Sequence, residues 1–124
     1  INDIEANINR YVGENRADVV IVDYLQIVSI EGVDNRENAI SEITRRLKVS
    51  ASTNKLVLLT ASQLNDEGRL RESRAIGMHS NQIIYVEHLK TKSKVTVKKN
   101  RRGPKDYRID IIMHGETSRI EEVF

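Results

Sequence analysis

Residues 17–26, ADVVIVDYLQ, are an apolar run that ends abruptly in a carboxylate. Val19 to Val22 are continuously β-branched and apolar, which is typical of a strand buried on both faces of a parallel sheet. Asp23 follows this strand directly. Because the carboxyl ends of parallel strands open into the ligand crevice, the sequence places Asp23 where a phosphate and its Mg²⁺ would lie.

An aspartate in this position is the second of the two nucleotide motifs in P-loop ATPases, where it helps to hold the metal. The first motif, G-x-x-x-x-G-K-[ST], does not occur in the 124 residues. We therefore expect the chain to be the later part of an ATPase domain whose phosphate-binding part lies outside it. A structural aspartate that caps a loop is the alternative that the motif alone leaves open.

The composition bounds the class of protein. The chain is 39% hydrophobic and 31% charged, which is ordinary for a soluble protein, and its length fits one domain or less. It contains no Cys, which excludes disulfides and thiolate metal sites. No apolar run approaches the roughly 20 residues that span a bilayer, and the polar start differs from a signal peptide. We expect a cytoplasmic protein that has no membrane partner.

Positive charge is concentrated in residues 90–108, which contain nine Lys or Arg and one acidic residue, Asp106. Clustered cations of this density attract the phosphates of a nucleotide or of a nucleic acid. Lysines also protect the edge of a solvated β-hairpin from aggregation. The charge count alone favours neither interpretation.

Two helices are expected from apolar residues at helical spacing. The first covers residues 1–14 and ends near Gly13. The second begins near Arg36 and is capped by Asp34 or Asn35. The expected buried stripe of the second helix is Ile40, Ile43, Leu47 and Ala51.

The remaining pattern predicts strands. Buried strands are expected over 19–22 and 56–60, and the helix between them makes this a right-handed parallel crossover. A polar loop with one helical turn follows. The next expected elements are a strand over 83–86, a β-hairpin with its turn at 101–104, and a last strand over 118–123. We expect a mixed sheet with helices packed against it.

Polar side chains follow both expected parallel strands. Asp23 and Gln26 come after the first strand, and Gln63 in the stretch Ser62-Gln63-Leu64-Asn65 comes after the second. Parallel strands bring these residues to one edge of the sheet. Gln26 could order a water or contact the metal shell, and the Gln63 amide could bind a phosphate oxygen or an attacking water. A loop amide satisfied by backbone groups is the alternative for Gln63.

Two groups of cations could bind phosphate. The first lies at the expected hairpin turn, from which an Arg can reach a neighbour's γ-phosphate; it consists of Lys99, Arg101 and Arg102. The second lies in the polar loop and suits the phosphates of single-stranded nucleic acid; it consists of Arg69, Arg71 and Arg74. Solubility and surface salt bridges are the alternatives. The three histidines lack metal-ligand spacing and are assigned no role.

Five segments occur in a fixed order: VVIVDYLQIVS, DNRENAISEITRRLKVSASTNK, LTASQLN, LRESRAIG and VKKNRRGP. In this order they resemble the ATPase domain of DnaB-type replicative DNA helicases, which has a RecA-like fold. The resemblance covers nearly the whole chain. It implies a partial RecA-like three-layer α/β fold, in which residues 1–124 form the later part of a single ATPase domain from the Walker B strand onward.

The resemblance also implies roles for individual residues. Asp23 matches the Walker B aspartate that supports Mg²⁺, and Gln63 matches the glutamine that links the γ-phosphate to DNA binding. Lys99 and Arg101 match the basic pair, including the arginine finger, that reaches into the neighbouring subunit's nucleotide site. Arg71 and Glu72 match positions of a DNA-binding loop, where Arg74 is also expected to bind DNA. Gln26 and Arg102 are expected near the nucleotide from their positions after the strand and at the hairpin turn.

Members of this family are hexameric rings that translocate on single-stranded DNA with ATP or another NTP and Mg²⁺. A primase and a helicase loader are further partners that the resemblance suggests. The sequence departs from the family pattern in lacking the P-loop and the upstream catalytic glutamate, and Arg74 stands where a Gly is expected. We therefore expect the chain alone to be a fragment that does not hydrolyse ATP and that self-associates through an incomplete sheet.

Other classes of protein stay open at this point. One is a non-catalytic helicase-like module that binds DNA or contacts a ring. Another is a different RecA-like ATPase, such as a recombinase, although DYLQ together with K-x-R-x-G-P fits helicases better.

Overall fold

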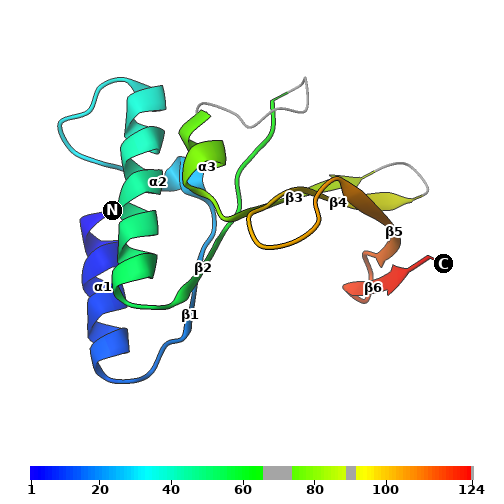
Figure 1. Cartoon of the computed structure of the whole chain (residues 1–124), viewed down its shortest axis with the longest axis horizontal. Coiled ribbons are helices and arrows are strands. Elements are labelled where there is room, and N and C mark those ends of the chain that lie inside the picture. Colours follow the sequence, from blue (N-terminus) through cyan, green and yellow to red (C-terminus); the bar gives the residue numbers. More distant parts are fainter. Residues whose placement is uncertain (66–73, 89–91, 124) are drawn as a thin grey trace. The chain divides into compact units, whose positions relative to one another are not determined.

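The computed structural model of the chain describes residues 1–65, 74–88 and 92–123 (Figure 1). The chain divides into two compact units, Ile1–His79 and Ser80–Phe124. The first contains a parallel pair of strands and the second an antiparallel sheet of four strands. The chain is therefore an α/β protein, as expected. The prediction of one mixed sheet is wrong for the residues described, because the parallel and antiparallel strands form two separate sheets.

The first unit is built around a strand–helix–strand crossover. Its elements in chain order are α1 (Asn2–Gly13), β1 (Val19–Val22), the short 3-10 helix η1 (Leu25–Ile27), α2 (Arg36–Thr53), β2 (Val57–Thr60) and α3 (Arg74–His79). The two strands run parallel, with Val19 opposite Val57 and Val22 opposite Thr60. The predicted helices and the predicted parallel pairing are thereby confirmed.

Local sequence signals set the ends of both long helices. The Asn35 side chain caps α2, because its Oδ1 accepts a hydrogen bond from the Asn38 backbone N–H at 3.0 Å. Helix α1 ends at Gly13, as expected, and the chain then turns through Asn15, whose φ is +53°. Asn is one of the few residues with a side chain that tolerates this left-handed conformation.

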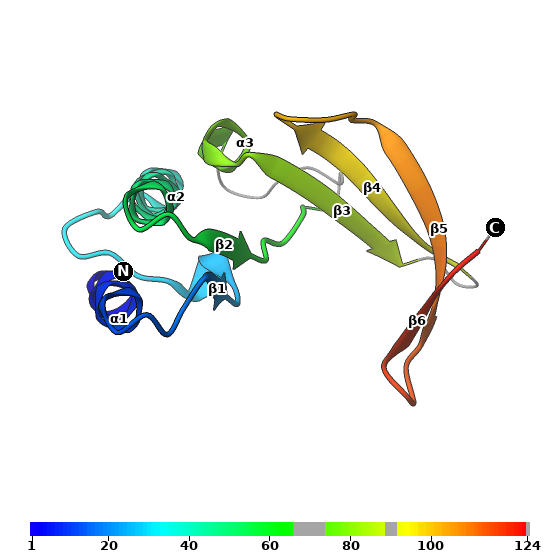
Figure 2. The same cartoon turned by 60° about the horizontal axis from the view of Figure 1, so that its bottom comes forward.

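The core of the first unit lies between the helices and one face of the parallel strands. Leu25, Ile40 and Ile43 are fully buried, and the cluster around them also contains Val22, Val28, Leu47 and Ile76. Both views show α1 and α2 on the same side of β1 and β2 (Figure 2). The predicted stripe of α2 is confirmed except at Ala51, which is half-buried; Ser50 is buried in its place.

The other face of the parallel pair is exposed, so the prediction that β1 is buried on both faces is wrong, and β2 is buried on one face only. Val19 and Ile21 are 51% and 71% exposed, and their partners Val57 and Leu59 are 55% and 51% exposed. Side chains alternate between the faces of a strand. Within residues 1–65 and 74–79, the helical core covers only the face of Val20, Val22 and Leu58. A third layer on the opposite face stays a prediction.

The second unit is a four-stranded antiparallel meander. Its strands are β3 (Gln82–His88), β4 (Ser93–Asn100), β5 (Tyr107–His114) and β6 (Arg119–Glu122), and each pairs with the next. The predicted hairpin and last strand are therefore confirmed. The pairing of β3 with β4 shifts register between Ile83 and Ile84, which face Lys99 and Val97, so Lys98 is an extra residue on β4. Such a bulge bends and twists the strand that carries it.

Among the residues that the structure describes, no helix is both long enough and apolar enough to cross a membrane.

Candidate functional site

The carboxyl ends of the two parallel strands carry the first group of candidate residues. Strand pairing ends at Val22 and Thr60, and the chain beyond each strand stays joined to the other. The Thr60 hydroxyl donates to the Val22 carbonyl at 2.9 Å, and the Leu25 backbone N–H donates to the Ala61 carbonyl at 3.0 Å. The sequence prediction that Asp23, Gln26 and Gln63 share one edge of the sheet rests on this parallel pairing.

Gln26 joins the two loops through its side chain. Its Nε2 donates to Oγ of Ser62 at 2.9 Å, and its Oε1 accepts from the Gln63 backbone N–H at the longer distance of 3.5 Å. The Arg36 guanidinium, at the start of α2, donates to the Gln26 backbone carbonyl. Both ends of the Gln26 amide are thus engaged inside the protein, and its predicted contact with a nucleotide is untested.

Asp23 is exposed at the end of β1, and its peptide bond to the half-buried Tyr24 is cis. An exposed carboxylate suits Mg²⁺, which typically binds one or two carboxylates and completes its shell with water and phosphate oxygens. Among the described residues, no group of three or more His, Cys, Asp or Glu side chains is arranged to hold a metal ion. The predicted role of Asp23 as a metal ligand stays a prediction.

Lys99, Arg101 and Arg102 lie at the end of β4 in the second unit, as the hairpin prediction requires. The Asn100 side chain organises the turn that follows. Its Oδ1 accepts from the Arg102 backbone N–H at 3.2 Å and from Nε2 of Gln82 at 3.4 Å, and the Arg101 backbone N–H donates to the Asn81 carbonyl at 3.1 Å. Both arginines are exposed.

Gly103 lies close to the Asn100 side chain. A Cβ at Gly103 would lie 2.7 Å from Nδ2 of Asn100, closer than real Cβ atoms approach. The sequence RRGP is therefore matched to the Asn100 side chain as well as to the turn.

The pKa of Lys99 is lowered, first by burial of its ammonium group and then by the positive charge of Arg101. Lys99 is half-buried opposite Ile83. Burial and a second cation both disfavour the charged form of Lys99, whereas an anion that approaches the end of β4 would favour it.

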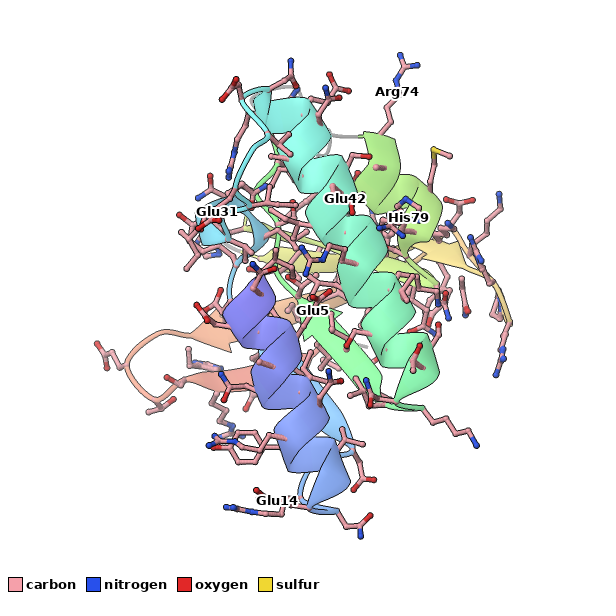
Figure 3. The ribbon with its side chains drawn as sticks, turned by 90° about the vertical axis from the view of Figure 1, so that its left-hand side faces the viewer. Glu5, Glu14, Glu31, Glu42, Arg74 and His79 are labelled. Carbon is pink, nitrogen blue, oxygen red and sulfur yellow. The ribbon has the colours of Figure 1, made fainter. Side chains whose placement is uncertain are left out.

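The candidate DNA loop is only partly described. Arg74 is the first residue of α3, and its exposed side chain points away from the helix (Figure 3). Arg69, Arg71 and Glu72 lie outside the described residues. Asp23 belongs to the first unit, whereas Lys99, Arg101 and Arg102 belong to the second.

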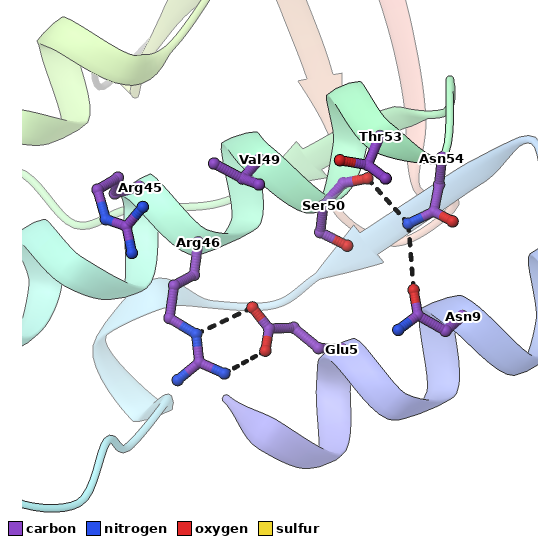
Figure 4. Close-up of a pocket in the computed structure, with 8 residues that line it drawn as sticks. All are labelled: Glu5, Asn9, Arg45, Arg46, Val49, Ser50, Thr53 and Asn54. Carbon is purple, nitrogen blue, oxygen red and sulfur yellow. Dashed lines mark hydrogen bonds and ion pairs between the residues drawn. The ribbon is translucent and has the colours of Figure 1, made fainter.

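A polar hollow of about 360 Å³ lies between α1 and α2 (Figure 4). The Arg46 guanidinium forms an ion pair with Glu5 across it, which raises the pKa of Arg46, and Asn54 Nδ2 donates to Asn9 Oδ1 at 3.2 Å. The residues that line the hollow are Glu5, Asn9, Arg45, Arg46, Val49, Ser50, Thr53 and Asn54. None of the predicted site residues lines it, and its polar groups join the two helices.

Sequence reasoning missed two members of the group at the strand ends. They are Ser62, inside the SQLN stretch, and Arg36, at the predicted start of a helix, and the sequence alone indicates no role for either. The Ser62 hydroxyl accepts from Gln26, which is 36 residues away in sequence. Local sequence patterns do not indicate a contact over that separation.

The fold and this group together define an α/β domain with a carboxylate and two amides at the ends of adjacent parallel strands. The family model of the DnaB-like helicase C terminal domain matches residues 1–122, so the chain belongs to this family.

Three relatives are similar to parts of the chain. A probable plasmid replicative DNA helicase of Chlamydia trachomatis is 31% identical over 103 residues, which cover 73% of this chain and 23% of the relative. The replicative DNA helicase DnaB of Buchnera aphidicola is 30% identical over 115 residues, covering 76% of this chain and 25% of the relative. DnaB of Geobacillus stearothermophilus is 30% identical over 76 residues, covering 60% and 17%. The chain thus spans about a quarter or less of the length of these relatives.

Proposed function

We propose that this chain is the later part of the motor domain of a hexameric, NTP-driven replicative DNA helicase that translocates on single-stranded DNA. In this proposal residues 1–124 belong to a single RecA-like three-layer domain. The observation that carries the proposal is the parallel pairing of β1 and β2, which Asp23 and Gln63 follow in sequence, with the Gln26 side chain contacting the Gln63 backbone. The family match and the names of the relatives support it.

Asp23 and Gln63 would act on the nucleotide bound by the same subunit. The Asp23 carboxylate would hold Mg²⁺, which when bound with an NTP neutralises charge on the phosphates. Gln63 is exposed and lies three residues after Thr60, the last residue of β2. Its neutral amide can donate to a phosphate oxygen or accept from a water without changing the charge of the site.

The β4 cations would act on the neighbouring subunit. Arg101 and Arg102 are exposed on a turn, and Lys99 carries a positive charge that burial and Arg101 disfavour. A guanidinium that approaches the γ-phosphate of a neighbour stabilises the charge that develops there. This role requires a ring in which each nucleotide lies between two subunits.

The loop before α3 would contact single-stranded DNA. Arg74 supplies an exposed cation at the start of α3. Arg71 and Glu72 lie two to three residues before it in the sequence. The chain is 4% aromatic, so few side chains could stack on bases. Binding is expected to depend on phosphates and to be insensitive to sequence.

The proposal is tested first by reading the coding sequence upstream of Ile1. A G-x-x-x-x-G-K-[ST] motif there supports a helicase motor. A start codon directly before Ile1 contradicts it and favours a non-catalytic helicase-like module that binds DNA or contacts a ring.

The site is tested in the complete helicase by replacing Asp23 with Asn. We expect NTP hydrolysis to fall about 100-fold or more, as is usual when a group that stabilises transition-state charge is removed. Asp18→Asn is the matched control, because Asp18 lies before the opposite end of β1 and contributes its backbone carbonyl to Val57. Equal activity of the two variants would overturn the assignment of Asp23.

A further inference from the structure

We propose that Gln26 is a positioning residue: it holds the backbone at Gln63 in place for nucleotide sensing and does not itself contact the nucleotide. This inference rests on the function proposed for Gln63. It follows from the contacts of both ends of the Gln26 side-chain amide, which bridges the loops after β1 and β2.

The bridge lies where the backbone ladder has stopped. The last paired residues are Val22 and Thr60, and beyond them the Leu25 N–H still reaches the Ala61 carbonyl. Each later link uses the Gln26 side chain: first Ser62 Oγ at 2.9 Å, then the Gln63 N–H at 3.5 Å. Gln26 therefore continues the connection between the strands for two further residues.

The two sides of the bridge are anchored unequally. On the η1 side, Leu25 is fully buried in the core, and the Arg36 guanidinium donates to the Gln26 carbonyl from the start of α2. On the β2 side, Gln63 is exposed. Gln26 is anchored to the core and to α2, whereas Gln63 is exposed and less constrained. The contact between them therefore restricts Gln63 more than Gln26.

The chemistry of the bridge sets the variants that test it. A glutamine side chain offers a donor at Nε2 and an acceptor at Oε1. Methionine has a similar length but provides neither of these groups in useful strength, so Gln26→Met removes both links. Glu keeps both, because the Ser62 hydroxyl can rotate and donate to a carboxylate that also accepts from the Gln63 N–H.

The first measurement uses the 124-residue chain and backbone ¹⁵N relaxation. We expect the order parameter of the Gln63 N–H to fall from near 0.85 to below about 0.6 in Gln26→Met, the range of flexible backbone, and to stay near its original value in Gln26→Glu. Gln82→Met is the control, because Gln82 lies on β3 of the second unit. An unchanged order parameter of the Gln63 N–H in Gln26→Met would overturn the proposal.

The second measurement is a double-mutant cycle on NTP hydrolysis by the complete helicase, with Gln26→Met and Ser62→Ala. We expect each change to lower kcat about tenfold with little change in KM, and the double variant to be no slower than Gln26→Met, because neighbours that act through one contact are not additive. Ser52→Ala, on the exposed side of α2, is the control. A raised KM with additive losses would mean that Gln26 touches the nucleotide.

Failure of the proposed function can be distinguished from failure of the positioning role of Gln26. The relaxation measurement succeeds or fails whether or not the chain belongs to an NTP-driven motor. If Asp23→Asn leaves hydrolysis unchanged, the proposed function fails; if Asp23→Asn abolishes it while Gln26→Met changes neither Gln63 dynamics nor kcat, only the positioning role fails.

Discussion

Asn35 shows how one side chain sets the start of an element. Its Oδ1 accepts the Asn38 N–H, one of the backbone donors that the first turn of α2 leaves without an intrahelical partner. The same helix then presents Ile40 and Ile43 to the core and, through Arg36, contacts the carbonyl of Gln26. A cap at this residue therefore supports both the core and the candidate site.

Replacing Asn35 with Ala is expected to lower the free energy of unfolding by about 1 kcal/mol, the usual cost of losing an N-cap. Asn38→Ala is the matched control, since Asn38 contributes its backbone N–H to this hydrogen bond. Urea unfolding of both variants measures the difference. Equal stability of Asn35→Ala and Asn38→Ala would contradict the role of the cap.

Glu42, on the exposed side of α2, makes a pH-dependent contribution to the stability of the fold. Two hydrogen bonds from Arg45, at 2.8 and 2.6 Å, are the main cause of a lowered Glu42 pKa. The positive charges of Arg46 and His79 act in the same direction and burial acts against it; Figure 3 shows Glu42 on α2 facing His79 on α3.

A carboxyl whose pKa is lower in the folded chain stabilises the fold above its ordinary pKa, near 4.5, and loses this effect as the pH falls through the folded value. We therefore expect Glu42→Gln to unfold at a lower temperature than the parent at pH 6, and the difference to shrink as the pH falls to 3. The effect is small because the pair is exposed. A difference that grows in acid would show the opposite sign of linkage.

At the scale of elements, the parallel pair has two unlike faces. Val22 and Ile40 lie in the core, whereas Ile21 is 71% exposed on the opposite face. The four exposed apolar residues form two cross-strand pairs, Val19 with Val57 and Ile21 with Leu59. Parallel strands are normally covered on both faces, so this face is where the chain differs most from its expected class.

Because the two faces differ in burial, replacing Ile with Ala is expected to cost more folding free energy in the core than on the exposed face. Ile40→Ala removes a fully buried side chain and is expected to cost about 2–5 kcal/mol of folding free energy. Ile21→Ala is expected to cost less than about 1 kcal/mol, since most of that side chain is already in water. Chemical denaturation of the 124-residue chain measures both. A cost at Ile21 that equals the cost at Ile40 would mean that the β1–β2 face is covered in solution.

At the scale of the whole molecule, charge is divided unevenly along the chain. Residues 90–108 contain nine of the 20 Lys and Arg but only one acidic residue, although the net charge of the chain is only +2. Arg74 adds an exposed cation at the start of α3. Phosphate contacts made by such residues release counterions, so affinity for single-stranded DNA should fall steeply with salt.

Arg74→Ala is expected to weaken binding of single-stranded DNA and to reduce the slope of log affinity against log salt by about 0.7, which corresponds to one lost phosphate contact. The effect should be the same for different base sequences. Arg16→Ala is the control, because it removes one exposed cation that pairs with Glu14. Fluorescence anisotropy at several salt concentrations measures both. Equal slopes for the two variants would exclude a phosphate contact by Arg74.

The sequence by itself determined the features that depend on local patterns: the helices and their ends, the parallel pairing of β1 with β2, the hairpin, and family membership. It narrowed the cap of α2 to Asp34 or Asn35, and the structure selects Asn35. Helical spacing and β-branched runs act over a few residues, so one chain suffices to read them. The predicted roles of Asp23, Gln63, Lys99 and Arg101 remain predictions, because they depend on a nucleotide and a neighbouring subunit.

Only the tertiary structure decided what packs against each surface. It divided the strands into two sheets, left Ile21 exposed, and exchanged Ala51 for Ser50 in the core. It also joined Gln26 to Ser62, 36 residues away. Burial and long-range hydrogen bonds depend on which distant segments meet, and the spacing of residues along a chain does not contain that information.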